Sequence, residues 1–306
     1  MQRRNFIKQA AFSLAASGIS NGIVHAAARQ QSLVILHTND VHSRIDPFPM
    51  DGGRNQGLGG VLPRMQMINE IRAQNEHVLL LDAGDIFQGT PYFNYFKGEP
   101  EMKAMASMGY DAATMGNHDF DGGIDNFTQQ LEHANFPILI SNYDFKGTSL
   151  HGGTKPYKVF KKGKLTIGVF GLGIALEGLV PKALYQNTTY LEPLPIANEM
   201  ADHLRRQEKC DLIICLSHLG YDYGTSPKIS DKKLASLSKN IDIIIGGHTH
   251  TFLTAPTVVM NKENRQVIIN QVGWGGIYLG RIDITFDNVN KRNFMSPNNL
   301  AVEQKN

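Results

Sequence analysis

The sequence holds only two cysteines among its 306 residues, Cys210 and Cys215. They lie five positions apart in the apolar stretch KCDLIICLSH, so we expect buried free thiols rather than a disulfide. Hydrophobic residues make up 42% of the chain and charged residues 19%. This composition is that of a globular protein that buries a substantial core, as one large domain or two modest ones.

The sequence also has no marked excess of basic or acidic residues. Lysine and arginine number 30, and aspartate and glutamate number 28. Residues 1–28 hold Arg3, Arg4 and Lys8 and no acidic residue, so removing them takes three basic residues from 30 and leaves 27 against 28 acidic ones. A near-neutral surface lacks the basic footprint of nucleic-acid-binding proteins. We therefore expect no nucleic-acid partner.

Long hydrophobic runs are absent after residue 28, so no membrane anchor is expected in the mature form. Residues 1–28 have a basic start with the pair Arg3 and Arg4, a mildly apolar run, and the small residues HAAA where a peptidase would cut. This order predicts an export signal of the twin-arginine type and a periplasmic location. The alternative is a frayed basic terminus. A lipoprotein anchor is not supported, because no cysteine lies near the cleavage region.

Several stretches are apolar without interruption, as in strands that are buried on both faces. They cover residues 33–39, 77–85, 136–142, 211–218 and 241–248. Helical patterns lie between them at residues 61–73, 101–108, 122–134 and 195–208. Alternating strands and helices predict a layered α/β fold.

The pattern changes after residue 250. The short stretches TVVM, RQVIINQVG and YLGRIDITFD are joined by turn residues, and they predict a closing antiparallel meander. Earlier in the chain, YKVFKKGKLTIGVFG predicts a hairpin that turns at Gly163. Residues 291–306 are polar and aperiodic, so we expect a loose tail there. The folded domain is thus expected over residues 29–290.

Polar side chains follow the buried strands. They are Asp40 and His42, Asp85, Asn117 and His118, His218, and His248 with His250. The carboxyl ends of strands in open α/β sheets form the ligand crevice. A single histidine there is more often a structural residue, but five clusters of aspartate, asparagine and histidine favour a metal site.

Two of these clusters place candidate ligands two positions apart. Residues i and i+2 of an extended chain point the same way, so His248 and His250 can direct both side chains into one cavity, as can Asp40 and His42. The metal ions of two-metal hydrolases lie about 3.5 to 4 Å apart, a gap that adjacent ligands suit. Neighbouring glycines would allow sharp turns and close approach to the ions; they are Gly84, Gly116, Gly246 and Gly247.

In this order, ILHTNDVHSR, GD, GNHDF, SH and GGHTH resemble the motifs of the calcineurin-like metallophosphoesterases, in particular the bacterial 5'-nucleotidase branch. The resemblance covers nearly all of the chain after residue 28. It implies that residues 29–290 form a metallophosphoesterase domain, a layered αββα metallophosphatase sandwich with two mixed sheets. It also implies two divalent metal ions, which could be Mn, Zn, Fe or Co.

The resemblance also implies a role for each polar residue at the strand ends. One ion would be held by Asp40, His42, Asp85 and His250. The other would be held by Asp85, Asn117, His218 and His248, so that Asp85 bridges the two ions. His118 would face the phosphate of the substrate, and Asp121 would orient His118.

The chemistry that follows from the resemblance is phosphoester hydrolysis. A hydroxide that bridges the two ions would attack phosphorus in line, while the ions and a protonated His118 stabilise the developing charge. We expect a phosphomonoesterase that acts on nucleotides. The alternatives are a cyclic-nucleotide phosphodiesterase, a hydrolase of UDP-sugars or sulfur esters, and a non-catalytic metal-binding scaffold.

Relatives with 5'-nucleotidase activity usually carry a second domain that sandwiches the base between aromatic residues, and this sequence ends after the catalytic domain. The resemblance therefore supports phosphoester hydrolysis better than it supports any one nucleotide. A separately encoded partner could supply the missing specificity surface.

Four residues near the clusters keep their own interpretations. We expect His37 to have a structural role rather than to be a metal ligand. Asn39 is expected either to hydrogen-bond a ligand or to cap the turn. We expect Asp119 to cap a helix that begins near residue 121. Trp274 could line the cleft or pack within a turn.

Overall fold

The apolar stretches of the sequence form the central strands of two mixed sheets of six strands each. The computed structural model describes residues 31–286, 292–295 and 299–303. The expected signal peptide, residues 1–28, lies outside the described residues.

The first sheet has the order β13-β12-β1-β2-β3, and β14 also pairs with β12. Its strands are β1 (Gln31–Thr38), β2 (Val78–Asp82), β3 (Ala112–Ala113), β12 (Tyr278–Phe286), β13 (Arg292–Met295) and β14 (Leu300–Ala301). β1, β2 and β3 run parallel to one another, whereas β12 runs antiparallel to β1.

The second sheet has the order β10-β11-β9-β8-β6-β5. Its strands are β5 (Tyr157–Lys162), β6 (Leu165–Leu172), β8 (Leu212–Ser217), β9 (Ile243–Gly246), β10 (Thr257–Met260) and β11 (Gln266–Asn270). The four central strands are parallel, and β5 and β10 are antiparallel edges. The predicted hairpin is confirmed as β5 and β6, with Gly163 in the turn at a φ of +59°. β4 (Tyr143–Asp144) and β7 (Thr189–Tyr190) form a separate pair.

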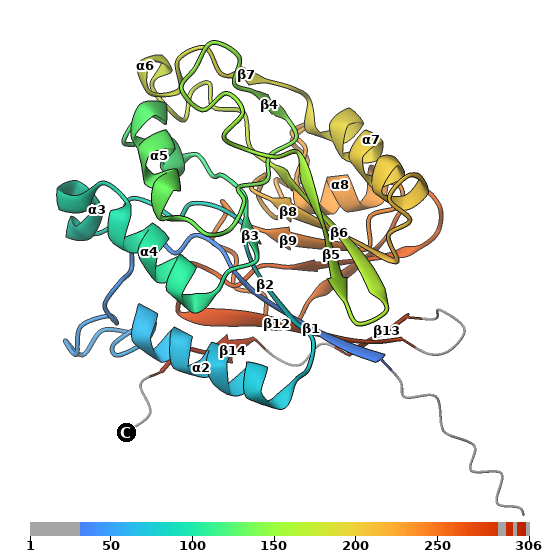
Figure 1. The fold of residues 1–306 in the computed structure, drawn as a ribbon, viewed down its shortest axis with the longest axis horizontal. Helices are drawn as coiled ribbons and strands as arrows, with labels where there is room; N and C mark the ends of the chain where they lie inside the picture. The colour runs from blue at the N-terminus through green and yellow to red at the C-terminus, as the bar shows by residue number, and fades with distance from the viewer. Residues whose placement is uncertain (1–30, 287–291, 296–298, 304–306) are drawn as a thin grey trace, which may run out of the picture. The chain divides into compact units, whose positions relative to one another are not determined.

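Helices cover the outer faces of the sheets (Figure 1). They are α2 (Val61–Gln74), α3 (Pro91–Phe96), α4 (Glu99–Met108), α5 (Ile124–Gln130), α6 (Lys182–Tyr185), α7 (Pro193–Arg206), α8 (Asp231–Leu237) and the 3-10 turns η1 (His118–Phe120) and η2 (Leu131–His133). The four predicted helical patterns are confirmed as α2, α4, α5 with η2, and α7. In the part of the chain that the structure describes, none of the helices has both the length and the apolarity needed to cross a membrane.

Alternation along β1 shows how the layers pack. Leu33 and Ile35 belong to the apolar cluster between the two sheets, whereas Val34 and Leu36 belong to the cluster that the first sheet shares with α2 and α4. A third cluster joins the outer face of the second sheet to α7 and α8. Three apolar interfaces between four layers confirm the layered αββα order.

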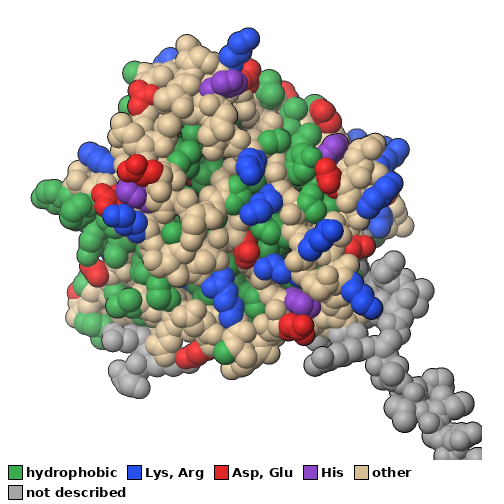
Figure 2. All heavy atoms as spheres, viewed as in Figure 1, with side chains coloured by type: hydrophobic (Ala, Val, Ile, Leu, Met, Phe, Trp, Pro, Cys, Tyr) green, Lys and Arg blue, Asp and Glu red, His purple; other side chains and the backbone are tan. Residues whose placement is uncertain are grey.

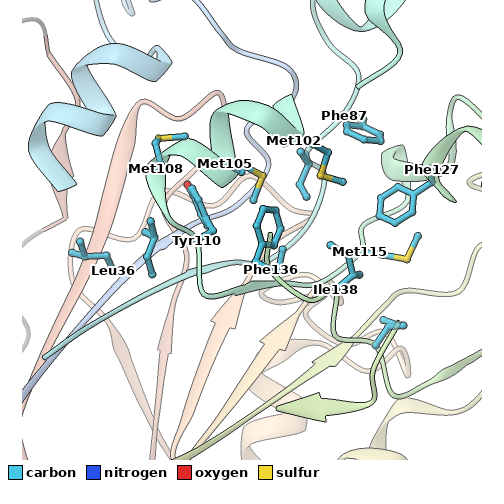
Figure 3. Packing of buried hydrophobic residues seen from close by; sticks show 14 of the residues in the cluster. Leu36, Phe87, Met102, Met105, Met108, Tyr110, Met115, Phe127, Phe136 and Ile138 are labelled. Carbon is cyan, nitrogen blue, oxygen red and sulfur yellow. The ribbon is translucent and has the colours of Figure 1, made fainter. Parts of the chain in front are cut away.

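The outer cluster on the first sheet is rich in sulfur and aromatic rings. Met102, Met105 and Met108 lie on the buried side of α4, in the same cluster as Tyr110 and Phe136 (Figure 3). Unbranched methionines fill irregular gaps between helix and sheet. On the surface shown in Figure 2, lysines and arginines stand among aspartates and glutamates, as the near-neutral charge balance suggests.

Cys210 and Cys215 are both buried and free, as expected. Both belong to the cluster between the second sheet and the helices α7 and α8.

The apolar run at 136–142 does not form the expected strand. Ile138 and Leu139 make only isolated bridges, to Ala113 and Lys155. Pro137 lacks the N–H group that a continuous ladder needs. The run therefore pairs only briefly, with Ala113 of β3 and then with Lys155, which lies outside the named strands.

The prediction of a closing antiparallel meander is also wrong. β10 and β11 are antiparallel, but β11 lies parallel to β9, and β12 crosses to the first sheet beside β1. The strands after residue 250 therefore belong to both sheets and tie them together. Neighbouring hydrophobic patterns do not reveal this choice of partner, because each strand has apolar residues that suit either sheet.

The tail expected from residue 291 is not loose throughout. β13 and β14 pair along one edge of β12, and Val302 is fully buried. These strands of four and two residues are too short to show a period in the sequence. Their pairing satisfies backbone groups at an edge of β12 that would otherwise stay open.

Candidate metal centre

The loops that follow β1, β2, β3, β8 and β9 meet at the carboxyl ends of these strands. They carry the seven candidate ligands Asp40, His42, Asp85, Asn117, His218, His248 and His250. The structure brings six of them into two groups whose ligand atoms lie within 4.8 Å of one another in each group. Asn117 joins the second group through His248.

The first group is Asp40, His42 and His250. The Nε2 atoms of His42 and His250 lie 3.0 Å apart, and Nε2 of His250 lies 3.4 Å from Oδ1 of Asp40. Asp40 and His42 are buried, whereas the side chain of His250 is 41% exposed. Two members of this group are therefore buried, and solvent reaches the group at His250.

The second group is Asp85, His218 and His248. Nε2 of His218 lies 3.1 Å from Oδ2 of Asp85, and Nδ1 of His248 lies 2.8 Å from Oδ1 of Asn117. Oδ2 of Asp85 is also 3.9 Å from Nε2 of His42 in the first group. One carboxylate oxygen therefore stands between the donors of both groups.

The pKa values of His218 and Asp85 show that the space between their side chains favours positive charge. Burial lowers the pKa of His218, but the Asp85 carboxylate outweighs it and raises the pKa to about 10. Burial raises the pKa of Asp85, while His218 and then His42 hold it below its usual range. A proton and a divalent cation would compete for the space between this imidazole and this carboxylate. Burial lowers the pKa of His248 to about 4, which keeps its imidazole neutral, as a metal ligand must be.

The donors fit divalent transition-metal ions. Nδ1 of His218 hydrogen-bonds the carbonyl oxygen of Ala83 at 2.7 Å, an arrangement that directs the other ring nitrogen of metal-ligating histidines at the ion. That nitrogen, Nε2, is buried and has no partner with hydrogen-bond geometry among the described residues. Imidazole, carboxylate and amide donors together suit Mn, Fe, Co and Zn.

The backbone at the site is not extended. Five candidate ligands have a left-handed φ: +48° at Asp40, +52° at His42, +55° at Asp85, +75° at His248 and +53° at His250. The expectation that ligands two positions apart share one side of an extended strand is therefore wrong. The chain turns at each of them, and His248 and His250 point into different groups. Such strain costs about 1–3 kcal/mol per residue and concentrates at functional sites.

His118 lies beside both groups. Its backbone N–H donates to Oδ1 of Asp85 at 2.8 Å, and its ring lies 5.2 Å from that of His42 between centroids. Nδ1 of His118 lies 2.8 Å from Oδ2 of Asp121, and this hydrogen bond raises the pKa of the imidazole despite partial burial. The side chain is 38% exposed, so it is open to a molecule arriving from solvent. The structure thus brings both candidate catalytic residues to the site.

Asn39 holds the first group in place. Its Nδ2 donates to Oδ2 of Asp40 at 2.6 Å and to the carbonyl oxygen of Gly273 at 2.7 Å, and its Oδ1 accepts from the N–H of Val272. Of the two roles expected for Asn39, a hydrogen bond to a ligand or a cap of the turn, the structure shows the hydrogen bond to the candidate ligand Asp40.

His37 is buried and lies away from both groups. Nδ2 of Asn270 lies 2.9 Å from its Nε2, and burial lowers its pKa to about 3. This neutral, hydrogen-bonded imidazole agrees with the structural role favoured for it.

Asp119 does not cap a helix, contrary to expectation. Its buried carboxylate accepts N–H groups from two loops, those of Asp85, Ile86 and Phe87 after β2 and that of Gly116 after β3. It therefore joins the loops that carry two candidate ligands. The sequence does not reveal this role of Asp119. Apart from Gly116, its partners are backbone N–H groups more than thirty residues earlier in the chain.

Gln271 is a further residue that the sequence patterns miss. Its Nε2 donates to the carbonyl oxygen of Gly247 at 2.7 Å, and its Oε1 accepts from the N–H of Thr251 at 2.5 Å. It thus spans the loop that presents His248 and His250. The only signal in the sequence is a pair of amides, Asn270 and Gln271, directly after the apolar run VII.

The comparison with protein families covers this whole site. A family model described as calcineurin-like phosphoesterase matches residues 33–252 of the chain. The matched span begins in β1 and ends two residues after His250, so it contains every candidate ligand.

The chain is also similar in sequence and in fold to individual known proteins. A snake venom 5'-nucleotidase from Crotalus adamanteus is 37% identical over 283 residues, which are 85% of this chain and 46% of that protein. The solved 5'-nucleotidase precursor from Thermus thermophilus has a TM-score of 0.79 at 30% identity, over 89% of this chain and 55% of that chain. A sulfate thiohydrolase from Thermus thermophilus has a TM-score of 0.72 at 18% identity, over 88% and 56%, which shows a likeness of fold alone. The chain spans about half the length of the curated relatives it matches.

Proposed function

The chain belongs to the calcineurin-like phosphoesterase family, and from this premise we propose that it is a metal-dependent phosphomonoesterase with nucleotides as its substrates. One observation carries the proposal. Oδ2 of Asp85 lies 3.1 Å from Nε2 of His218 and 3.9 Å from Nε2 of His42. Cations held by the two groups would lie side by side and share Asp85, as in two-metal hydrolases.

The residues divide between two cations. Asp40, His42 and His250 would hold one, and Asn117, His218 and His248 would hold the other, with Asp85 shared. When bound, the two ions would polarise the phosphoryl oxygens and lower the pKa of water so that it can act as a nucleophile.

His118 is the acid of the proposed reaction. Its Nδ1 is engaged by Asp121 at 2.8 Å, so Nε2 is the nitrogen that would donate a proton to the leaving ester oxygen. Asp121 fixes the ring orientation and the tautomer. Its carboxylate also stabilises the imidazolium form until the proton is transferred.

Nucleotides are proposed because the similar proteins from Crotalus adamanteus and Thermus thermophilus are named 5'-nucleotidases. The similarity spans the candidate ligands, and His118 and Asp121 lie within the same matched span.

The test is hydrolysis of AMP, cyclic AMP, UDP-glucose and an aryl phosphate, with the products separated by chromatography, because cleavage of cyclic AMP or UDP-glucose at one bond releases no free phosphate. The chain is first treated with a chelator and then supplied with Mn, Zn, Fe or Co one at a time. We expect hydrolysis of AMP to disappear with the chelator and to return with at least one metal. Asp85→Asn should abolish activity, whereas Asp202→Asn, at a half-exposed position in α7, should not. Undiminished hydrolysis after complete removal of metal would contradict the proposal.

We also propose that the chain is exported to the periplasm by a twin-arginine signal. The support is the pair Arg3 and Arg4 ahead of an apolar run. Cell fractionation of the full chain and of the double variant Arg3→Lys, Arg4→Lys tests this. The parent chain should appear in the periplasm and the variant should remain inside the cell; equal distribution of both would contradict export by this route.

A further inference from the structure

A cavity of about 710 Å³ lies outside the two metal groups. Its wall includes three aromatic side chains, Phe252, Trp274 and Tyr278. The volume is within the range of sites that bind small molecules, which are mostly apolar with a few polar groups. We call it the Trp274 cavity.

Trp274 connects this cavity to the candidate metal centre. Its ring stacks on the imidazole of His250, with the centroids 6.0 Å apart and the planes inclined by 19°. Phe252, two residues after His250, lines the same cavity. The cavity therefore begins one side chain away from a candidate metal ligand. A molecule with its phosphate at the metal groups would have its remainder close to this cavity.

Phe252 and Tyr278 form an aromatic corner of the wall. Their rings meet edge to face, with the centroids 5.8 Å apart and an angle of 74°. Phe252 is 46% exposed, although an apolar side chain of this size is usually buried. It packs over the backbone of Gly273, where an added Cβ would come within 2.1 Å of the ring. The glycine thus lets the ring lie against the chain while leaving part of it open to a ligand.

Polar groups stand among the aromatic ones. Arg54, Asn55 and Thr254 line the cavity. Arg54 is exposed, and no residue in the described part of the chain makes an ion pair or hydrogen bond with its side chain. A guanidinium without a protein partner is available to stack on a ring or to donate to acceptors at its edge. A flat aromatic ligand with a polar edge therefore matches this wall better than an aliphatic one.

We propose that the Trp274 cavity binds the nucleobase of the substrate. The proposal rests on the proposed function for placing the phosphate at the metal groups, but binding of the base requires no catalysis. Stacking on aromatic side chains suits every base, because each has a π face. The chain would thus provide a base site from its own β9–β10 and β11–β12 loops.

The composition of the chain gives a direct probe. Trp274 is the only tryptophan in the sequence, so intrinsic tryptophan fluorescence reports on this cavity and on the His250 ring stacked against it. The full chain, treated with a chelator, is titrated with adenosine, which has no phosphate, and with ribose as the control. We expect adenosine to change the fluorescence saturably and ribose to leave it unchanged. The absence of a saturable change with adenosine would overturn the proposal.

Variants of Phe252 separate stacking from bulk. Phe252→Ala and Phe252→Leu should both weaken adenosine binding about tenfold, the size of the loss when one base loses its aromatic partner. Tyr95→Ala is the matched control, since Tyr95 is an aromatic residue of α3 that is 80% exposed and does not line this cavity. Circular dichroism would show that the variants are folded. Adenosine binding that is unchanged in both Phe252 variants would overturn the assignment.

Kinetics then connect the cavity to catalysis. Phe252→Ala should raise KM for AMP about tenfold and leave kcat for AMP and KM for ribose 5-phosphate unchanged. An equal rise for both substrates would overturn the base site. If adenosine binds and no nucleotide is hydrolysed, the proposed function fails and the base site stands. If AMP is hydrolysed, adenosine does not bind and KM is unaffected, the base site fails and the function stands.

Discussion

At the scale of single residues, Asp85 shows how many constraints one side chain can meet. Its φ is +55°, its Oδ1 accepts the N–H of His118, and its Oδ2 faces His218. The neighbouring Gly116 allows this, because an added Cβ there would lie 2.1 Å from Oδ1 of Asp85. The sequence predicts Asp85 as a candidate ligand from its place after a strand. It cannot predict the support from Asp119, which depends on contacts that only the folded chain makes.

His118→Ala is expected to separate catalysis from metal binding. His118 contacts Asp85 through its backbone N–H, which the substitution keeps, so the metal groups should remain intact. Loss of the proton donor should lower kcat by about 10² to 10⁴. Elemental analysis and steady-state kinetics measure the two effects. Asp121→Asn should lower kcat less, because the imidazole stays in place. An unchanged kcat in His118→Ala would refute its role as the acid.

His37 should make stability depend on pH. Burial lowers its pKa from 6.5 to about 3 in the folded chain, so the unfolded chain binds more protons between these values. The stabilisation is complete above pH 6.5 and is lost progressively as the pH falls towards 3. Lowering the pH from about 7.5 to about 5.5 should therefore decrease the free energy of unfolding by about 1.4 kcal/mol through this group.

Denaturant unfolding of the parent chain and of His37→Gln at the two pH values measures this cost. Glutamine keeps an acceptor for Asn270 but does not titrate. The parent should lose more stability than the variant on acidification. Equal losses would show that His37 is not the group responsible.

At the scale of elements, hydrophobic patterns predict where strands and helices lie better than how strands pair. The runs that became β1, β2, β8 and β9 are buried on both faces and stand out in the sequence. The partner of β12 cannot be identified in the same way, because its alternating pattern fits beside a strand of either sheet. Beside β1, its Gly280 lies opposite His37, where the imidazole leaves no room for a Cβ. That requirement is invisible until the register is known.

Gly280→Ala tests this pairing. An added Cβ at this position would lie 2.1 Å from Nε2 of His37, so we expect a loss of about 1–3 kcal/mol in the free energy of unfolding from overpacking. The same substitution in a His37→Ala background should cost less, because the imidazole is gone. Urea unfolding of the four chains gives the coupling energy. A cost that is the same in both backgrounds would contradict the steric account.

At the scale of the whole molecule, two sheets carry one centre. Loops from the first sheet supply Asp40, His42 and Asp85, and loops from the second supply His218, His248 and His250. The apolar cluster between the sheets therefore sets the distance between the two groups of donors. The layered fold and the convergence at the strand ends follow from the sequence. The left-handed turns at the ligands do not, because single residues in that conformation leave no periodic pattern.

The central claim is that two cations lie side by side and share Asp85. Anomalous diffraction from crystals grown with the activating metal tests it most directly. The account predicts two peaks about 3.5 to 4 Å apart, one beside His42 and His250 and the other beside His218 and His248, with Asp85 between them. A single peak in fully active protein, or two peaks that do not share Asp85, would contradict it.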